Sequence, residues 1–205
     1  MNKLYADLQH RFDAAGFLIL KGSEFYSDAQ WEIIDGYSNQ VSYESVQKGL
    51  QKDSEYAAHV GRIVLDGPTP SGEYLQINEP ENLADCSTEL LWTILNPRVL
   101  AVTSAIASID IPKVQRCQYN LLRSGDHIGK HIDALHGIPY DLTFVLGLEG
   151  DYQGGIFQLY GQTNSEVFFH KISEKDLIIF KSPLLHSVTK VSSGKRKTLC
   201  LFLKK

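Results

Sequence analysis

Residues 185–203, LHSVTKVSSGKRKTLCLFL, contain two short runs of β-branched and apolar residues on either side of a turn rich in Ser and Gly. The two runs predict strands over 185–191 and 197–203, because β-branched side chains suit a pleated sheet and Ser and Gly favour turns. The same pattern fills the chain from Val114 onward, with further runs at 114–122, 142–148, 155–160, 166–170 and 176–180. With an additional short piece at 131–133, these strands predict a small barrel or jelly roll.

The first 110 residues have a helical pattern instead. Apolar residues recur at helical spacing from Leu4 to Ala15, and Gly16 can end this helix before an apolar strand over 17–20. Further helices are expected from Ser27 onward and near 43–51, 87–95 and 97–108. Trp31 and Trp92 lie on helical stripes and are expected in the core.

The segment 61–86 differs from both halves. It holds a short strand at 62–65, the turn-rich GPTPSG and a strand-like EYLQI, a combination typical of loops that cover a site. Helices first and strands last indicate an α+β chain. We expect one domain, 1–205, in which a helical buttress with substrate-covering loops (1–110) supports a jelly-roll catalytic core (111–205).

Composition excludes several classes of function. At 205 residues and 43% hydrophobic content the chain can bury one sizeable core. The net charge is −4, and basic residues cluster only at 195–197 and at the last two positions, so nucleic acid is not an expected partner. Charged residues interrupt the first 20 positions, and no apolar stretch is long enough for a membrane span, which predicts a cytoplasmic protein without a membrane partner.

The three cysteines, Cys86, Cys117 and Cys200, are odd in number and widely spaced. They fit neither a disulfide framework nor a Cys-x-x-Cys zinc site, and we interpret them as small buried residues.

A candidate metal site begins in HIDALHG, residues 131–137. On a strand, His131 and Asp133 point to the same face and Ile132 turns the other way into the core. His186, at the entry to a late strand, is the candidate third ligand. Two histidines and one carboxylate on one face of an ion form the facial triad of non-heme Fe(II) oxygenases, which leaves positions open for a cosubstrate and O₂.

From about 114 to 203 the chain resembles the 2-oxoglutarate and Fe(II)-dependent dioxygenases, in particular the prolyl 4-hydroxylase-like branch. His131-Ile-Asp133 matches the family's H-x-D, with Gly125 six residues before it, and HSVTKVSSGKR resembles its H-x-V-T-x-V-x-x-G-x-R segment. The stretch 142–155 is similar to the hairpin that ends in Gly-Gly. The resemblance implies a double-stranded β-helix (jelly-roll, cupin-like) core buttressed by the N-terminal helices.

The resemblance also implies roles for individual residues. His131, Asp133 and His186 would bind Fe(II), and Arg196 would bind the distal carboxylate of 2-oxoglutarate, as a planar guanidinium can do with two parallel hydrogen bonds. Thr198 matches a hydroxyl position on the same face. Two tyrosines common in the family are Leu122 and Gly147 here. Tyr119, Asn120 or Thr143 could replace their hydroxyls, since the strand at 114–122 would line the same cavity.

The resemblance implies oxidation of an organic substrate with decarboxylation of 2-oxoglutarate to succinate and CO₂. The cofactors are Fe(II) and 2-oxoglutarate as cosubstrate, with ascorbate as a further candidate. We expect hydroxylation of a prolyl or other amino-acid residue in a peptide or protein. One alternative is hydroxylation of a free amino acid or small metabolite, and another is a sensor that binds a metal or carboxylate without turnover. The sequence does not specify the oligomeric state.

Overall fold

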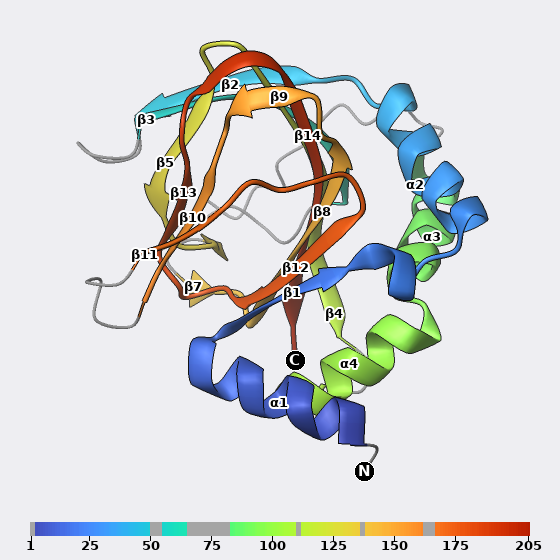
Figure 1. Cartoon of the computed structure of the whole chain (residues 1–205). Coiled ribbons are helices and arrows are strands. Elements are labelled where there is room, and N and C mark those ends of the chain that lie inside the picture. The colour runs from blue at the N-terminus through green and yellow to red at the C-terminus, as the bar shows by residue number, and fades with distance from the viewer. Residues whose placement is uncertain (1–2, 50–54, 65–82, 110–111, 136–137, 162–166) are drawn as a thin grey trace.

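A computed structural model describes residues 3–49, 55–64, 83–109, 112–135, 138–161 and 167–205. Their main feature is a curled, antiparallel sheet of twelve strands that closes round an interior (Figure 1). Its main path runs β1-β12-β8-β14-β4-β3-β5-β13-β10-β11, with β2 beside β3 and β9 beside β14, and β6 and β7 form a separate pair. The strands are β1 (Phe17–Lys21), β2 (Glu44–Gly49), β3 (Glu55–Val64), β4 (Lys113–Arg123), β5 (His127–His131), β6 (Ala134–Leu135), β7 (Ile138–Pro139), β8 (Leu142–Glu149), β9 (Tyr152–Gly154), β10 (Phe157–Tyr160), β11 (Val167–His170), β12 (Asp176–Lys181), β13 (His186–Val188) and β14 (Val191–Lys204).

Strict alternation along the central strands separates two hydrophobic clusters. On β14, Leu199 and Leu201 belong to an outer cluster that includes the helices, whereas Cys200 and Phe202 belong to a cluster inside the curled sheet. β8 and β12 alternate in the same way. Since successive side chains on a strand point to opposite faces, the fold buries both faces of these strands. The jelly-roll prediction is confirmed.

The helices cover the outer face of the sheet (Figure 1). They are α1 (Lys3–Ala15), α2 (Asp28–Gln40), α3 (Leu83–Ile94) and α4 (Pro97–Ala107), with a 3-10 turn, η1, at Gly22–Glu24. Gly16 ends α1 with φ +78°, a conformation that glycine adopts without a steric penalty. Ser27 caps α2 in a reciprocal arrangement with Gln30, as its position before the apolar stripe predicts.

The sequence prediction is wrong over residues 43–51, where a short helix was expected. The structure has β2 there instead, which pairs with β3, and β3 pairs in turn with both β4 and β5. β2 and β3 therefore extend the sheet that holds the site, whereas the sequence placed strands of that sheet after residue 110. The expected strand at 62–65 is the end of β3, while GPTPSG and EYLQI lie outside the described residues.

Two apolar side chains also differ from expectation. Trp31 is buried, but Trp92 is 67% exposed on α3. Ile132 was expected to turn into the core and is 41% exposed, because β5 ends at His131 and the alternation of a strand no longer applies beyond it.

Within the described part of the chain, no single helix has the length and apolarity needed to cross a membrane. One pair, Thr88–Ile94 and Pro97–Ala107, passes the length and composition criteria together but bends by 61° between the two parts.

Candidate active site

The three predicted metal ligands come together inside the sheet. His131 ends β5 and His186 begins β13, and the two residues are direct cross-strand partners, so their rings lie 4.1 Å apart between centroids. Asp133 follows two residues later, where its amide donates to the Ser182 carbonyl and its own carbonyl accepts from Tyr140. One ligand atom from each of the three residues lies within 4.8 Å of the others.

Both imidazoles are oriented in the way a metal requires. The Nδ1 atoms of His131 and His186 lie 2.9 Å from the carbonyl oxygens of Gly129 and Leu184. A carbonyl oxygen can only accept, so each Nδ1 carries a hydrogen and Nε2 is the ring nitrogen available to bind a metal. Those Nε2 atoms face the carboxylate of Asp133, at 3.5 Å from Oδ1 for His131 and 3.4 Å from Oδ2 for His186. A backbone carbonyl behind each ligating histidine is the usual support of a metal site.

The carboxylate of Asp133 is held in its charged form. Burial alone would raise the pKa of Asp133, but the neighbouring His186 and His131 outweigh burial and hold this pKa well below its usual range. Thr143, on β8, donates from Oγ1 to Oδ2 of Asp133 at 2.8 Å and also lies 2.8 Å from the Ser182 hydroxyl. Thr143, a predicted cosubstrate contact, thus orients a candidate metal ligand.

Arg196 lies on the inner face of β14, as alternation within Lys195-Arg196-Lys197 predicts. Its side chain is only 2% exposed, and its buried Nε has no hydrogen-bond partner in the described structure. Arg196 also forms no ion pair with any described carboxylate. A buried guanidinium is costly unless an anion compensates it, so this position fits the carboxylate of a ligand.

The other predicted cosubstrate contacts divide between the two faces of the sheet. Thr198 and Asn120 are direct cross-strand partners on the inner face, and Asn120 donates from Nδ2 to Sγ of Cys200 at 3.2 Å. Tyr119 faces the helices, where its hydroxyl donates to the Ile34 carbonyl at 2.6 Å. The expectation that Tyr119 could contact the cosubstrate is therefore wrong, because neighbouring residues on a strand point to opposite faces.

Cys200 lies between the candidate ligands and the buried arginine. Its ionisation is affected by both Asp133 and Arg196, and burial is the main reason that the pKa of Cys200 is raised to about 12. The residue is therefore a neutral thiol that helps to line the inner face.

Gly147 stands at the position where the family has a tyrosine, and the structure explains the difference. A Cβ at this position would lie 2.1 Å from the carbonyl oxygen of Ser173, so the segment before β12 leaves no room for a side chain. The amide of Lys175 also donates to the Gly147 carbonyl at 2.8 Å. Any replacement hydroxyl must come from another element.

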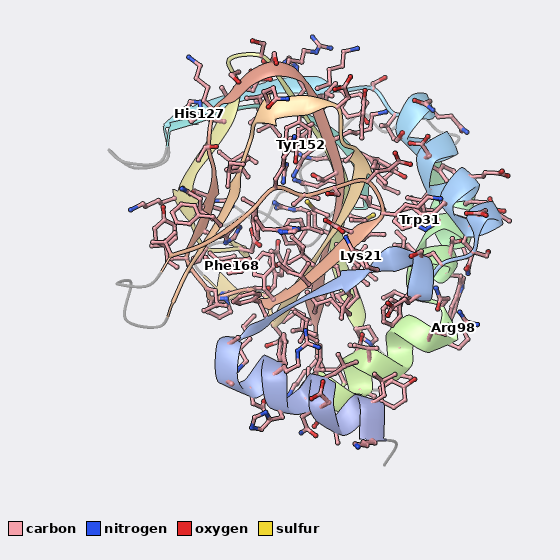
Figure 2. The ribbon with its side chains drawn as sticks, viewed as in Figure 1. Lys21, Trp31, Arg98, His127, Tyr152 and Phe168 are labelled. Carbon is pink, nitrogen blue, oxygen red and sulfur yellow. The ribbon has the colours of Figure 1, made fainter. Side chains whose placement is uncertain are left out.

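Tyr152, which sequence reasoning missed, places a hydroxyl near Arg196. It begins β9, and Figure 2 shows it within the ring of strands. Its phenol interacts electrostatically with the Arg196 guanidinium, and its hydroxyl donates to the Ile172 carbonyl at 2.6 Å. In the sequence, the only indication of this role is the position of Tyr152 three residues before Gly155 in the predicted hairpin. Its contact with Arg196 depends on the pairing of β9 with β14, which the sequence does not reveal.

Comparison with known proteins agrees with this geometry. A sequence model of the 2OG-Fe(II) oxygenase superfamily matches residues 115–204. A PKHD-type hydroxylase of Idiomarina loihiensis is 26% identical over 125 residues, and one of Prochlorococcus marinus strain MIT 9515 is 30% identical over 131 residues. These alignments cover 58% and 60% of this chain and 56% and 55% of the relatives, so the chain spans just over half the length of the curated relatives it matches.

Solved structures share the fold. An oxidoreductase of the 2OG-Fe(II) oxygenase family from Burkholderia pseudomallei superposes with a TM-score of 0.81 at 21% identity, covering 98% of this chain and 90% of that one. A Pseudomonas putida prolyl-4-hydroxylase gives 0.65 at 14% identity, covering 98% and 99%. The family implies Fe(II) and 2-oxoglutarate, and the two histidines and the aspartate fit the iron. Residues 115–204 of this chain are thus similar in sequence to the 2OG-Fe(II) oxygenase superfamily, and the whole described chain shares the fold of its solved members.

Proposed function

We propose that the protein is an Fe(II)- and 2-oxoglutarate-dependent hydroxylase. The observation that supports this most strongly is the arrangement of His131 and His186, whose Nε2 atoms both face the carboxylate of Asp133 while their Nδ1 atoms are held by backbone carbonyls. Three ligands on one face of an iron ion leave positions for a bidentate cosubstrate and O₂.

In this proposal Arg196 binds the distal carboxylate of 2-oxoglutarate. Its orphaned Nε and its burial without an acidic partner are the supporting observations. Tyr152 holds the guanidinium in place, and Thr198, Asn120 and Cys200 line the inner face between Arg196 and Asp133. Thr143 keeps the Asp133 carboxylate in position.

Bound iron with 2-oxoglutarate would activate O₂, so that one oxygen atom enters succinate and the other enters the substrate while CO₂ is released. The chain itself positions the reactants and excludes bulk water, since the inner faces of β8, β12 and β14 are packed with apolar side chains. We propose a prolyl or other amino-acid residue as the target, because one structural neighbour is a Trichoplax adhaerens prolyl hydroxylase in complex with a peptide fragment.

We further propose that the chain acts as one domain in the cytoplasm. β1 and β3, from the first 64 residues, pair with β12 and with β4 and β5, which argues against independent halves. Cys117 and Cys200 are free, buried thiols, as is usual in a reducing compartment.

Formation of succinate from 2-oxoglutarate tests the proposed activity. Metal-free protein supplied with Fe(II), 2-oxoglutarate and O₂ is expected to release succinate slowly without substrate and faster with one. Asp133→Ala is expected to abolish release, while Asp7→Ala, an exposed carboxylate on α1, should retain it. A protein that binds 2-oxoglutarate but never forms succinate, alone or with prolyl peptides and amino acids, would be a sensor instead.

A further inference from the structure

A second guanidinium, that of Arg116, lies on the inner face of the sheet, and the proposed cosubstrate site does not use it. Arg116 is on β4, directly opposite Phe202 of β14. Along β4 the inner face continues through Gln118 and Asn120 to Leu122, which is the partner of Arg196. The two guanidiniums therefore occupy different ends of the same inner face.

Contacts connect Arg116 with the candidate iron ligands. Its guanidinium lies over the Phe202 ring, 5.8 Å from the centroid. Phe202 is the direct cross-strand partner of Thr143, whose hydroxyl donates to Asp133. The Phe202 ring also packs against the Tyr140 ring, 5.2 Å between centroids, and the Tyr140 amide donates to the Asp133 carbonyl. Arg116 thus belongs to the row of side chains next to Asp133, away from the Arg196 end.

The charge of Arg116 has no acidic partner. In the described structure Arg116 takes part in no ion pair, and its buried Nε has no hydrogen-bond partner. Arg62, on β3, stands directly opposite Gln118 and adds a second guanidinium to the same part of the inner face. A cosubstrate that extends from the iron to Arg196 leaves the charge of Arg116 uncompensated. Guanidinium groups bind carboxylates through paired, charge-assisted hydrogen bonds.

We propose that the substrate carries a carboxylate and that Arg116 binds it, which places the oxidised carbon near the iron ligands. This inference rests on the proposed function. The carboxylate has two possible sources: the α-carboxylate of a free amino acid or an acidic side chain next to the target residue in a peptide. Both require the same guanidinium, and the experiment separates them.

The test compares matched probes that differ only in this charge. They are the 20 common L-amino acids and their C-terminal amides, together with acetylated, amidated pentapeptides in which proline is followed by Glu or by Gln. Succinate release above the level without substrate and a mass gain of one oxygen in the probe are the readouts. We expect stimulation by carboxylate members and a loss of at least about tenfold in their amides or Gln counterparts, the size typical of a charged hydrogen bond. Stimulation by amino acids identifies the α-carboxylate, and stimulation by Glu peptides identifies the side chain.

Variants then assign the effect to Arg116. Arg116→Met is expected to raise KM for the carboxylate probe at least about tenfold with a smaller change in kcat, and Arg116→Lys should restore part of the affinity, because the charge returns without the paired geometry. Arg123→Met, on the same strand but exposed, is the matched control and should behave as wild type.

Neutral probes as effective as their acidic partners, no stimulation by any carboxylate, or an unchanged KM in Arg116→Met would overturn the inference. If the wild-type protein releases no succinate at all, the proposed function fails as well, so the two failures are distinguishable.

Discussion

At the scale of single residues, Thr143 supports the candidate metal site through its hydrogen bond to the Asp133 carboxylate. Its hydroxyl contacts both Oδ2 of Asp133 and the Ser182 hydroxyl, so it fixes the carboxylate that both histidines face. Thr143→Val keeps the shape of the side chain but removes this hydrogen bond. We expect Fe(II) affinity to fall by about ten- to a hundredfold, as for other residues that support ligands.

Metal titration followed by calorimetry under anaerobic conditions measures that change. Thr103→Val is the matched control, because Thr103 is also buried and hydrogen-bonded, at 2.9 Å to the Val99 carbonyl within α4. The control should lose stability and keep its Fe(II) affinity. Equal affinities in all three proteins would show that Thr143 does not position Asp133.

Tyr152 is expected to act on the cosubstrate rather than on the metal. In Tyr152→Phe the ring still fills its place, but Arg196 loses its interaction with the phenol oxygen and the buried Ile172 carbonyl loses its donor. We expect KM for 2-oxoglutarate to rise several-fold while Fe(II) affinity stays unchanged, with a loss of about 1–2 kcal/mol in unfolding free energy. Steady-state kinetics and urea unfolding separate the two effects. An unchanged KM with reduced stability would leave Tyr152 a purely structural residue.

At the scale of elements, Asn96 organises the turn between α3 and α4. Its Oδ1 accepts from the amides of Arg98 and Val99, and its Nδ2 donates to the Phe25 and Thr93 carbonyls. Asn96→Ala therefore removes a buried cap and two further hydrogen bonds. We expect a loss of about 2 kcal/mol in unfolding free energy, against about 1 kcal/mol for Ser27→Ala at the exposed cap of α2. Thermal or urea unfolding of both variants gives the comparison.

Helices and strands whose apolar residues recur with a clear helical or strand periodicity were predictable from sequence, and the exceptions have physical causes. α1, α2, α3 and α4 carry apolar stripes, and the late strands carry β-branched runs, so the sequence indicates both kinds. The segment that forms β2 and the first residues of β3 are weakly patterned in sequence, yet they are strands because β3 pairs with β2, β4 and β5. Pairing partners distant in sequence leave no local signal.

At the scale of the whole molecule, residues from distant parts of the chain complete the candidate site. His131 and His186 are 55 positions apart in sequence and become direct cross-strand partners. The sequence identified both histidines as candidate metal ligands, one from the H-x-D motif and one from the segment that leads to Arg196. The same segment identified Arg196 as the candidate residue for binding the 2-oxoglutarate carboxylate. Tyr152 and the outward orientation of Tyr119 could not be predicted, because they depend on the pairing of β9 with β14 and on the side of β4 that faces α2.

The proposed site requires that His131, Asp133 and His186 bind iron and that Arg196 binds the 2-oxoglutarate chelated to it. Anaerobic titration of metal-free protein with Fe(II) and 2-oxoglutarate tests both parts, through the visible charge-transfer band of a chelated complex. We predict that the band appears at one iron per chain in the wild type, is lost in Asp133→Ala, and needs far more 2-oxoglutarate in Arg196→Met. No band in the wild type, or the same band in Asp133→Ala, would contradict the account.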